Sequence, residues 1–186
     1  PSRISEMAVR NCALRFSFAS PNSAPLLEAG INIKTFKINP LPKPKGEFIA
    51  HHITPQPIGV VTIYPGLSDE VVKNILMQPV KALILRSYGV GNAPSHPALL
   101  STLREATERG IVVVNLTQCI SGRVNMGGYA TGQALADVGV ISGYDMTFEA
   151  ALTKLHYLLS QQYSYTEICR LMQQNLRGEM TLNDDD

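Results

Sequence analysis

The stretch PVKALILRSYGVGNAP, residues 79–94, together with RGIVVVNLTQC, residues 109–119, decides how this chain folds. Each contains a short apolar run, at 80–85 and at 111–116, of the kind that forms buried strands. Residues 97–109 between them have apolar side chains at helical spacing, begin with Pro97 and close at Gly110. A strand, a helix and a second strand in this order predict a right-handed unit of parallel strands covered on both faces.

The same pattern continues on both sides of this unit. Upstream, residues 58–64 form another β-branched apolar run, and Ser68 is expected to cap a helix with Asp69 and Glu70 in its first turn. Downstream, helices are predicted at 129–137, at 147–160 with Thr147 as its cap, and at 166–176. We therefore predict an α/β fold, a small three-layer Rossmann-like or flavodoxin-like domain with a parallel sheet of about four strands.

The composition restricts the class of protein. The chain has 186 residues, of which 45% are hydrophobic and 17% charged, with a net charge of +1. No run reaches the roughly 18 apolar residues of a membrane span, and no cluster of basic and aromatic residues favours nucleic acid. Cys12, Cys119 and Cys169 are odd in number and widely spaced, so they suggest no disulfide framework. We expect a soluble, cytoplasmic protein with no membrane or nucleic-acid partner and no cofactor.

Two predicted loops carry polar residues that could do chemistry. Arg86 follows the run at 80–85 and is itself followed by Gly89 and Gly91, which permit a close backbone approach. Thr117, Gln118 and Cys119 follow the run at 111–116 and offer a hydroxyl, an amide and a thiol. Ligands of open parallel sheets bind beyond the carboxyl ends of the strands, so these residues could clamp a small zwitterion. Alternatively, the arginine only pairs with a carboxylate and the polar residues only cap backbone groups.

Other readings of the same residues are weaker. The pair Gly89 and Gly91 invites comparison with a dinucleotide fingerprint, but the third glycine would fall on Pro94. Cys119 could be a nucleophile, although no local signature places a histidine beside it.

The histidines suggest little chemistry. His51 and His52 could ligate a metal, yet no third ligand is nearby, so we expect no metal site. Ser95 is expected to cap the helix that begins at Pro97 rather than to act with His96 as a hydrolase pair. His156 is expected to pack within its helix.

Four segments resemble a known family in the family's order: ITPQPIGVVTIYPG at 53–66, PVKALILRSYGVGNAP at 79–94, RGIVVVNLTQCISGRVNMGGYATG at 109–132 and MTFEAALTKLHYLLSQ at 146–161. They resemble the C-terminal domain of bacterial cytosolic type I L-asparaginases, over residues 18–180. The resemblance implies an amidohydrolase of asparagine catabolism, built from two α/β domains and assembled as a homotetramer. Its catalytic threonines lie in the N-terminal domain, and no residue here matches them, so we expect this chain alone to be inactive.

The resemblance also implies roles for residues of this chain. In that family a second L-asparagine binds as an allosteric effector, at positions that match Arg86, Thr117, Gln118 and Cys119. A partner subunit is expected to add a contact from the position of Phe148. Asn92 is a candidate for reaching a partner's active site.

The chain divides into four parts on this reading. Residues 1–17 do not resemble the family segment that should precede FASPN, which suggests a truncated or frame-shifted product. Residues 18–57 form a proline-rich linker, 58–178 the asparaginase C-terminal domain and 179–186 an acidic tail. The alternatives are a stand-alone amino-acid-binding module and a non-functional relic.

Overall fold

A computed structural model of the chain describes residues 22, 27–29, 31–35, 46–128 and 130–181. The expectations for residues 1–17 and for the end of the acidic tail, 182–186, lie outside the described residues.

The centre of the fold is a four-stranded sheet. Its strands are β3 (Ile58–Thr62), β4 (Ala82–Ser87), β5 (Val112–Thr117) and β6 (Ile141–Ser142), they lie side by side in this order, and every pair is parallel. The predicted parallel sheet of about four strands is confirmed. Strands β4 and β5 each run on past the predicted strand end, by two residues and one residue. β6 was not located from the sequence because it is only two residues long.

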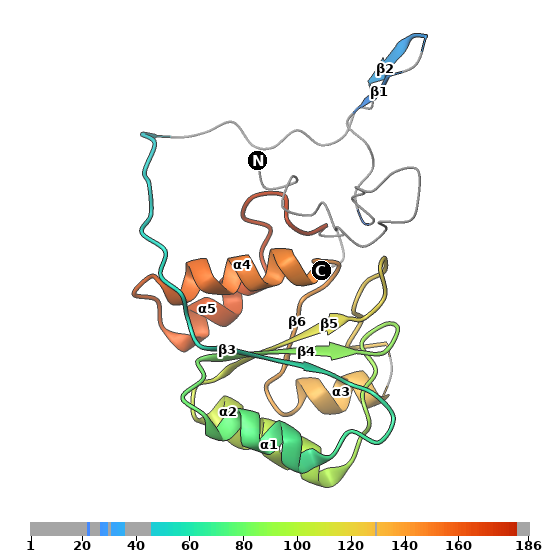
Figure 1. Ribbon diagram of the computed structural model, residues 1–186, viewed down its shortest axis with the longest axis vertical. Coiled ribbons are helices and arrows are strands. Elements are labelled where there is room, and N and C mark those ends of the chain that lie inside the picture. Colours follow the sequence, from blue (N-terminus) through green and yellow to red (C-terminus); the bar gives the residue numbers. More distant parts are fainter. Residues whose placement is uncertain (1–21, 23–26, 30, 36–45, 129, 182–186) are drawn as a thin grey trace.

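Helices cover both faces of the sheet, as Figure 1 shows. α1 (Asp69–Met77), α2 (Pro97–Glu108) and α3 (Ala130–Ala136) connect successive strands and pack on one face, while α4 (Phe148–Leu159) and α5 (Tyr165–Met172) follow β6 and pack on the other. The strand order does not reverse, so right-handed crossovers place all three connecting helices on the same side. The predicted three-layer α/β architecture is confirmed.

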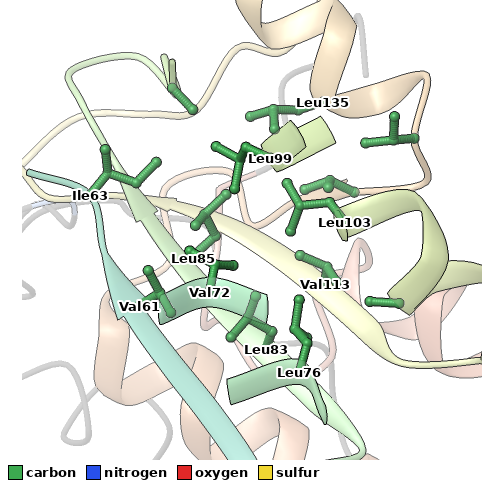
Figure 2. Close-up of a cluster of buried hydrophobic side chains, with 14 of the residues drawn as sticks. Val61, Ile63, Val72, Leu76, Leu83, Leu85, Leu99, Leu103, Val113 and Leu135 are labelled. Carbon is green, nitrogen blue, oxygen red and sulfur yellow. The ribbon is translucent and has the colours of Figure 1, made fainter. Parts of the chain in front are cut away.

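Alternation along the strands divides the core into two halves. Leu83 and Leu85 of β4 face the connecting helices, in the cluster that Figure 2 shows, whereas Ala82 and Ile84 face α4 and α5. All four are fully buried. Because successive side chains of a strand point to opposite faces, a sheet covered on both sides needs an unbroken apolar run. This is the physical reason why VKALIL and IVVVNL decided the fold.

The helix ends follow the predicted signals with two exceptions. The Ser68 hydroxyl accepts a hydrogen bond from the Glu70 N–H at 3.3 Å, and the Thr147 hydroxyl accepts one from the Ala150 N–H at 3.2 Å, as expected. The cap before α2 is His96, without a side-chain bond, so the expectation for Ser95 was wrong. Pro97 at the first helical position already removes one donor that would need a cap. The last predicted helix, 166–176, is shorter, because α5 ends at Met172.

Residues 46–57, which precede the domain, lie along α4. The Thr54 N–H donates to Ser160 Oγ, and the Gln56 N–H donates to His156 Nδ1, both at 3.0 Å. His156 therefore holds this segment as well as belonging to its helix. Further upstream, β1 (Leu27–Ala29) and β2 (Ile33–Thr35) form an antiparallel hairpin within the expected linker, drawn apart from the sheet in Figure 1. The division at residue 57 stays a prediction.

A buried ion pair fastens the C-terminal segment to α4. Lys154 Nζ lies 2.7 Å from Glu179 Oε1, with the two side chains 5% and 8% exposed. The ammonium also donates to the carbonyls of Met172 and Gln174, and the carboxylate accepts from the N–H groups of Leu176 and Arg177. Every group of the pair is thus engaged, as burial of charge requires. Within the described residues, no helix is long and apolar enough to span a membrane.

Candidate functional site

The candidate residues gather where β4 and β5 end. Arg86 belongs to β4 rather than to the loop after it, and Thr117 is the last residue of β5. The register pairs Arg86 with Leu116 and Ser87 with Thr117, so Arg86 and Thr117 are diagonal neighbours on adjacent strands. Strand spacing and rise put their Cα atoms about 6 Å apart. The two residues therefore share one edge of the sheet.

Arg86 points to the face that α4 covers. It continues the alternation of Ala82 and Ile84, and its guanidinium carbon lies 5.5 Å from the ring centroid of Phe148. Phe148 is the first residue of α4, where the helix dipole adds positive potential to that of the guanidinium. The guanidinium and the N-terminus of α4 both provide positive potential, which suits a carboxylate. This contact forms within one chain; the contact that a partner subunit would add from the position of Phe148 stays a prediction.

Thr117 points to the opposite face. Its Oγ1 donates to the Gly89 carbonyl at 2.5 Å and accepts from the Cys119 N–H at 3.1 Å. The hydroxyl proton is thereby used to tie the loop after β4 to the loop after β5. A ligand can still donate a hydrogen bond to the remaining lone pair of this oxygen.

The Gln118 side chain donates hydrogen bonds to backbone carbonyls at the ends of β3 and β4. Its Nε2 donates to the carbonyls of Ile63 and Arg86, at 2.6 and 2.9 Å, and its backbone N–H donates to the Ser87 carbonyl at 2.9 Å. Both amide hydrogens are engaged, so only the side-chain oxygen can meet a ligand. The residue holds the backbone of Arg86 in place.

Cys119 is an exposed free thiol next to these residues. The histidine contacts that the structure describes lie elsewhere: His51 packs edge-to-face against Tyr157, His96 Nδ1 lies 4.0 Å from Asp69 Oδ1, and His156 binds the Gln56 N–H. The nucleophile reading of Cys119 gains no support from them. In the described part of the chain, no three histidine, cysteine or acidic residues form a group that could hold a metal ion.

The glycine loop after β4 folds onto the protein itself. Its Tyr88 and Asn92 pair across a tight turn, and Asn92 Oδ1 accepts from the Thr131 hydroxyl at 2.7 Å. Gly91 has a φ of +107°, and a Cβ there would lie 2.7 Å from Val124 Cγ1. The close approach that Gly91 permits is therefore to a neighbouring loop.

Sequence reasoning missed a buried polar pair beneath the site. Ser87 Oγ donates to Asn115 Oδ1 at 2.6 Å, Asn115 Nδ2 donates to the Gly91 carbonyl at 3.0 Å, and neither Ser87 nor Asn115 is exposed. The signal was the single polar residue within IVVVNL. An asparagine in a fully buried strand needs partners on the neighbouring elements, and here they link β4, β5 and the glycine loop.

The fold defines a class: a three-layer α/β domain with polar residues at the carboxyl edge of a parallel sheet. The family is more specific. Residues 57–172 match the model of the Glutaminase/Asparaginase C-terminal domain, and the chain belongs to this family.

The chain resembles both bacterial and human proteins. The chain is 68% identical to L-asparaginase 1 of Escherichia coli K12 over 168 residues, which is 90% of this chain and 50% of that protein. It is 43% identical to the human 60 kDa lysophospholipase, covering 91% of this chain and 30% of that protein. A crystal structure of L-asparaginase I from Vibrio cholerae superimposes with a TM-score of 0.82 at 66% identity, covering 89% of this chain and 50% of that one. The chain thus spans about half the length of L-asparaginase 1.

Proposed function

We propose that this chain is the C-terminal, effector-binding part of an L-asparaginase, which converts L-asparagine and water to L-aspartate and ammonia. The observation that carries the proposal is the position of Arg86, beside Phe148 at the start of α4 and on the strand next to Thr117. The proposed effector is L-asparagine. The proposed setting is a cytoplasmic homo-oligomer in which an N-terminal domain supplies the catalytic threonines.

The chemistry of the rim suits an amino acid. The Arg86 guanidinium is a planar fork that can bind an α-carboxylate through two parallel hydrogen bonds. The remaining lone pair of Thr117 Oγ1 and the side-chain oxygen of Gln118 are acceptors, which suit an α-ammonium or a carboxamide N–H. Cys119 lines the same edge. Because Arg86 and Thr117 point to opposite faces of the sheet, a ligand has to lie across the strand ends to meet both.

Titration calorimetry with L-asparagine tests the site. Replacing Arg86 by alanine removes a charge-assisted pair of hydrogen bonds, so affinity should fall by about tenfold or more. Arg86→Lys keeps the charge without the fork and should give an intermediate loss. Arg104→Ala, which removes an exposed arginine from α2, is the matched control and should bind normally. Unchanged affinity in Arg86→Ala would rule out this site.

Ammonia release tests the activity. The chain alone should release none from L-asparagine, and adding a separately produced N-terminal half of L-asparaginase 1 should restore release. Turnover by the isolated chain would contradict the proposal.

A stand-alone amino-acid-binding module is the second candidate. It is favoured by the two apolar clusters, which give the domain a complete core of its own on both sheet faces. Asparagine binding that persists while the N-terminal half fails to restore ammonia release would select it.

A further inference from the structure

A single side chain from far upstream joins the loops beside the proposed effector site. Asn22 Nδ2 donates to the Asp145 carbonyl at 2.5 Å, and Asn22 Oδ1 accepts from the Gly122 N–H at 3.0 Å. Gly122 lies in the segment after β5, and Asp145 follows β6. One carboxamide therefore bridges the segments that follow two neighbouring strands, and both of its polar atoms are used.

The loop that Asn22 reaches has few other attachments. Cys119, Ile120, Ser121 and Gly122 are all exposed, and Ile120 is 56% exposed. Before them the chain is held by Gln118. After them it is held by Val124, whose N–H donates to the Tyr144 carbonyl at 3.0 Å. Between these two points, the bond to Asn22 fixes Gly122, whose φ of +129° is one that only glycine adopts readily.

Asp145 is a rigid support for this bridge. It is buried, at 9% exposure, and its Oδ1 accepts from the Thr181 N–H at 2.8 Å. The Thr181 carbonyl in turn accepts from Arg123 Nη1 at 2.9 Å. The upstream residue, the loop after β5 and the C-terminal segment thus meet at one place.

We propose that Asn22 is a positioning residue of the effector site, fixing the loop at 118–123 and thereby the backbone around Cys119. The inference rests on the proposed function for its link to asparagine, but the anchoring of the loop does not. It makes the beginning of the proline-rich linker part of the effector site's support, although Asn22 lies outside residues 57–172, the matched C-terminal domain. Any movement of the upstream segment would then change the effector affinity.

The competing explanation is that Asn22 only adds stability. Thr107 provides the matched control: its Oγ1 donates to the Val138 carbonyl at 2.7 Å, a long-range bond at the opposite, amino-terminal edge of the sheet. Thr107→Val keeps the shape and removes that bond. A residue that acts only through stability would affect the effector loop no more than Thr107 does.

The experiment uses the full chain and two readouts. Amide hydrogen exchange is followed at Gly122 and Cys119, and L-asparagine is titrated by calorimetry, for the wild type, Asn22→Ala, Asn22→Asp and Thr107→Val. In Asn22→Ala, loss of two hydrogen bonds should speed Gly122 exchange about tenfold or more and weaken asparagine binding by up to about tenfold. Asn22→Asp keeps the acceptor for Gly122 and should exchange more slowly than Asn22→Ala. Thr107→Val should change neither readout.

The outcomes separate the two proposals. Gly122 exchange that is equal in Asn22→Ala and the wild type overturns the positioning role, as does an equal effect from Thr107→Val. If Gly122 exchange rises in Asn22→Ala but the wild type binds no asparagine, the loop anchor stands and the effector function fails.

Discussion

Replacing Lys154 by methionine should destabilise the domain strongly. Lys154 and Glu179 are almost completely buried, and the ammonium is the only charged partner that the structure shows for this carboxylate among the described residues. Methionine fills a similar volume but donates no hydrogen bond. The carboxylate would keep two backbone N–H donors, from Leu176 and Arg177, and lose its counter-charge. The carbonyls of Met172 and Gln174 would lose a donor as well.

The magnitude follows from what is left unpaired. Breaking a buried ion pair by removing one partner costs about 3–5 kcal/mol, because the other charge remains in a poorly solvated place. A total stability of about 5–15 kcal/mol is ordinary for a domain, so this loss is a large fraction of it. For a chain of this size, the midpoint of thermal unfolding should fall by roughly 6–20 °C. The folded protein should nevertheless keep its sheet, because the hydrogen bonds of the pair go to residues 172–177.

Urea unfolding of a double-mutant cycle tests the reasoning. Glu179→Gln removes the orphaned charge, so Lys154→Met/Glu179→Gln should be more stable than the two single losses predict, by about 1–3 kcal/mol. The same cycle separates a charge effect from simple packing, because packing losses at the two positions would add. Additive losses, or a loss below about 1 kcal/mol in Lys154→Met, would refute the account.

The pair also predicts a dependence on pH. Burial, the largest single cause, would raise the pKa of Glu179, but the hydrogen bond and charge of Lys154 together with backbone hydrogen bonds hold that pKa below its ordinary value of 4.5. Burial lowers the pKa of Lys154 more than Glu179 raises it, so the favourable linkage lies on the glutamate. A carboxylate with a depressed pKa stabilises above its unfolded pKa and loses that contribution as pH falls through the folded value. The stability difference between the wild type and Glu179→Gln should therefore be constant near neutrality and shrink below about pH 4.5.

Three further substitutions probe the site. Gln118→Ala removes the side-chain donor to the Ile63 and Arg86 carbonyls and should lower the free energy of unfolding in urea by about 1–3 kcal/mol. An unchanged free energy of unfolding would mean that these two hydrogen bonds do not stabilise the fold. Thr117→Val removes the bond to Gly89 and should speed amide exchange in the glycine loop, whereas Thr117→Ser should not. Gly91→Ala adds a Cβ 2.7 Å from Val124 Cγ1 at a φ of +107° and should destabilise more than Gly89→Ala, where the φ is +50° and no atom lies within 4 Å.

The sequence predicted the layers of the fold because burial on both faces leaves a direct trace in residue type. The first four residues of β4 and the first three of β5 are buried and apolar, and the caps of α1 and α4 each offer a hydroxyl at one place. Strand burial and helix capping depend on residues close together in the chain, so short sequence patterns predict them. The sequence did not predict β6, because a strand of two residues is too short to show a periodic pattern. The hairpin of β1 and β2 was also missed, since each of its strands has only three residues.

The sequence predicted which residues of the candidate site lie close together, but not which hydrogen bonds they make. Adjacency of Arg86 and Thr117 follows from parallel pairing, which the apolar runs imply. The partners of Thr117 and Gln118 do not follow, because a hydroxyl or an amide next to a strand end can bind either a ligand or a carbonyl of the next loop. The structure gives them the carbonyls of Gly89, Ile63 and Arg86. Only three-dimensional proximity decides between these two uses.

Thr117 and Gln118 can bond to backbone carbonyls and to a ligand at the same time, and this combination suggests how the proposed site responds to an effector. Hydrogen bonds to backbone carbonyls fix Thr117 and Gln118, so in the proposed site these side chains need no further ordering when an effector binds. Arg86 is proposed to supply the charge that selects an anionic group. In this proposal the exposed residues between Gln118 and Val124 are the adjustable part, and Asn22, from outside the matched domain, holds them at Gly122. An effector that orders this loop and an upstream segment that orders it through Asn22 act on the same equilibrium, so each must strengthen the other by the same factor.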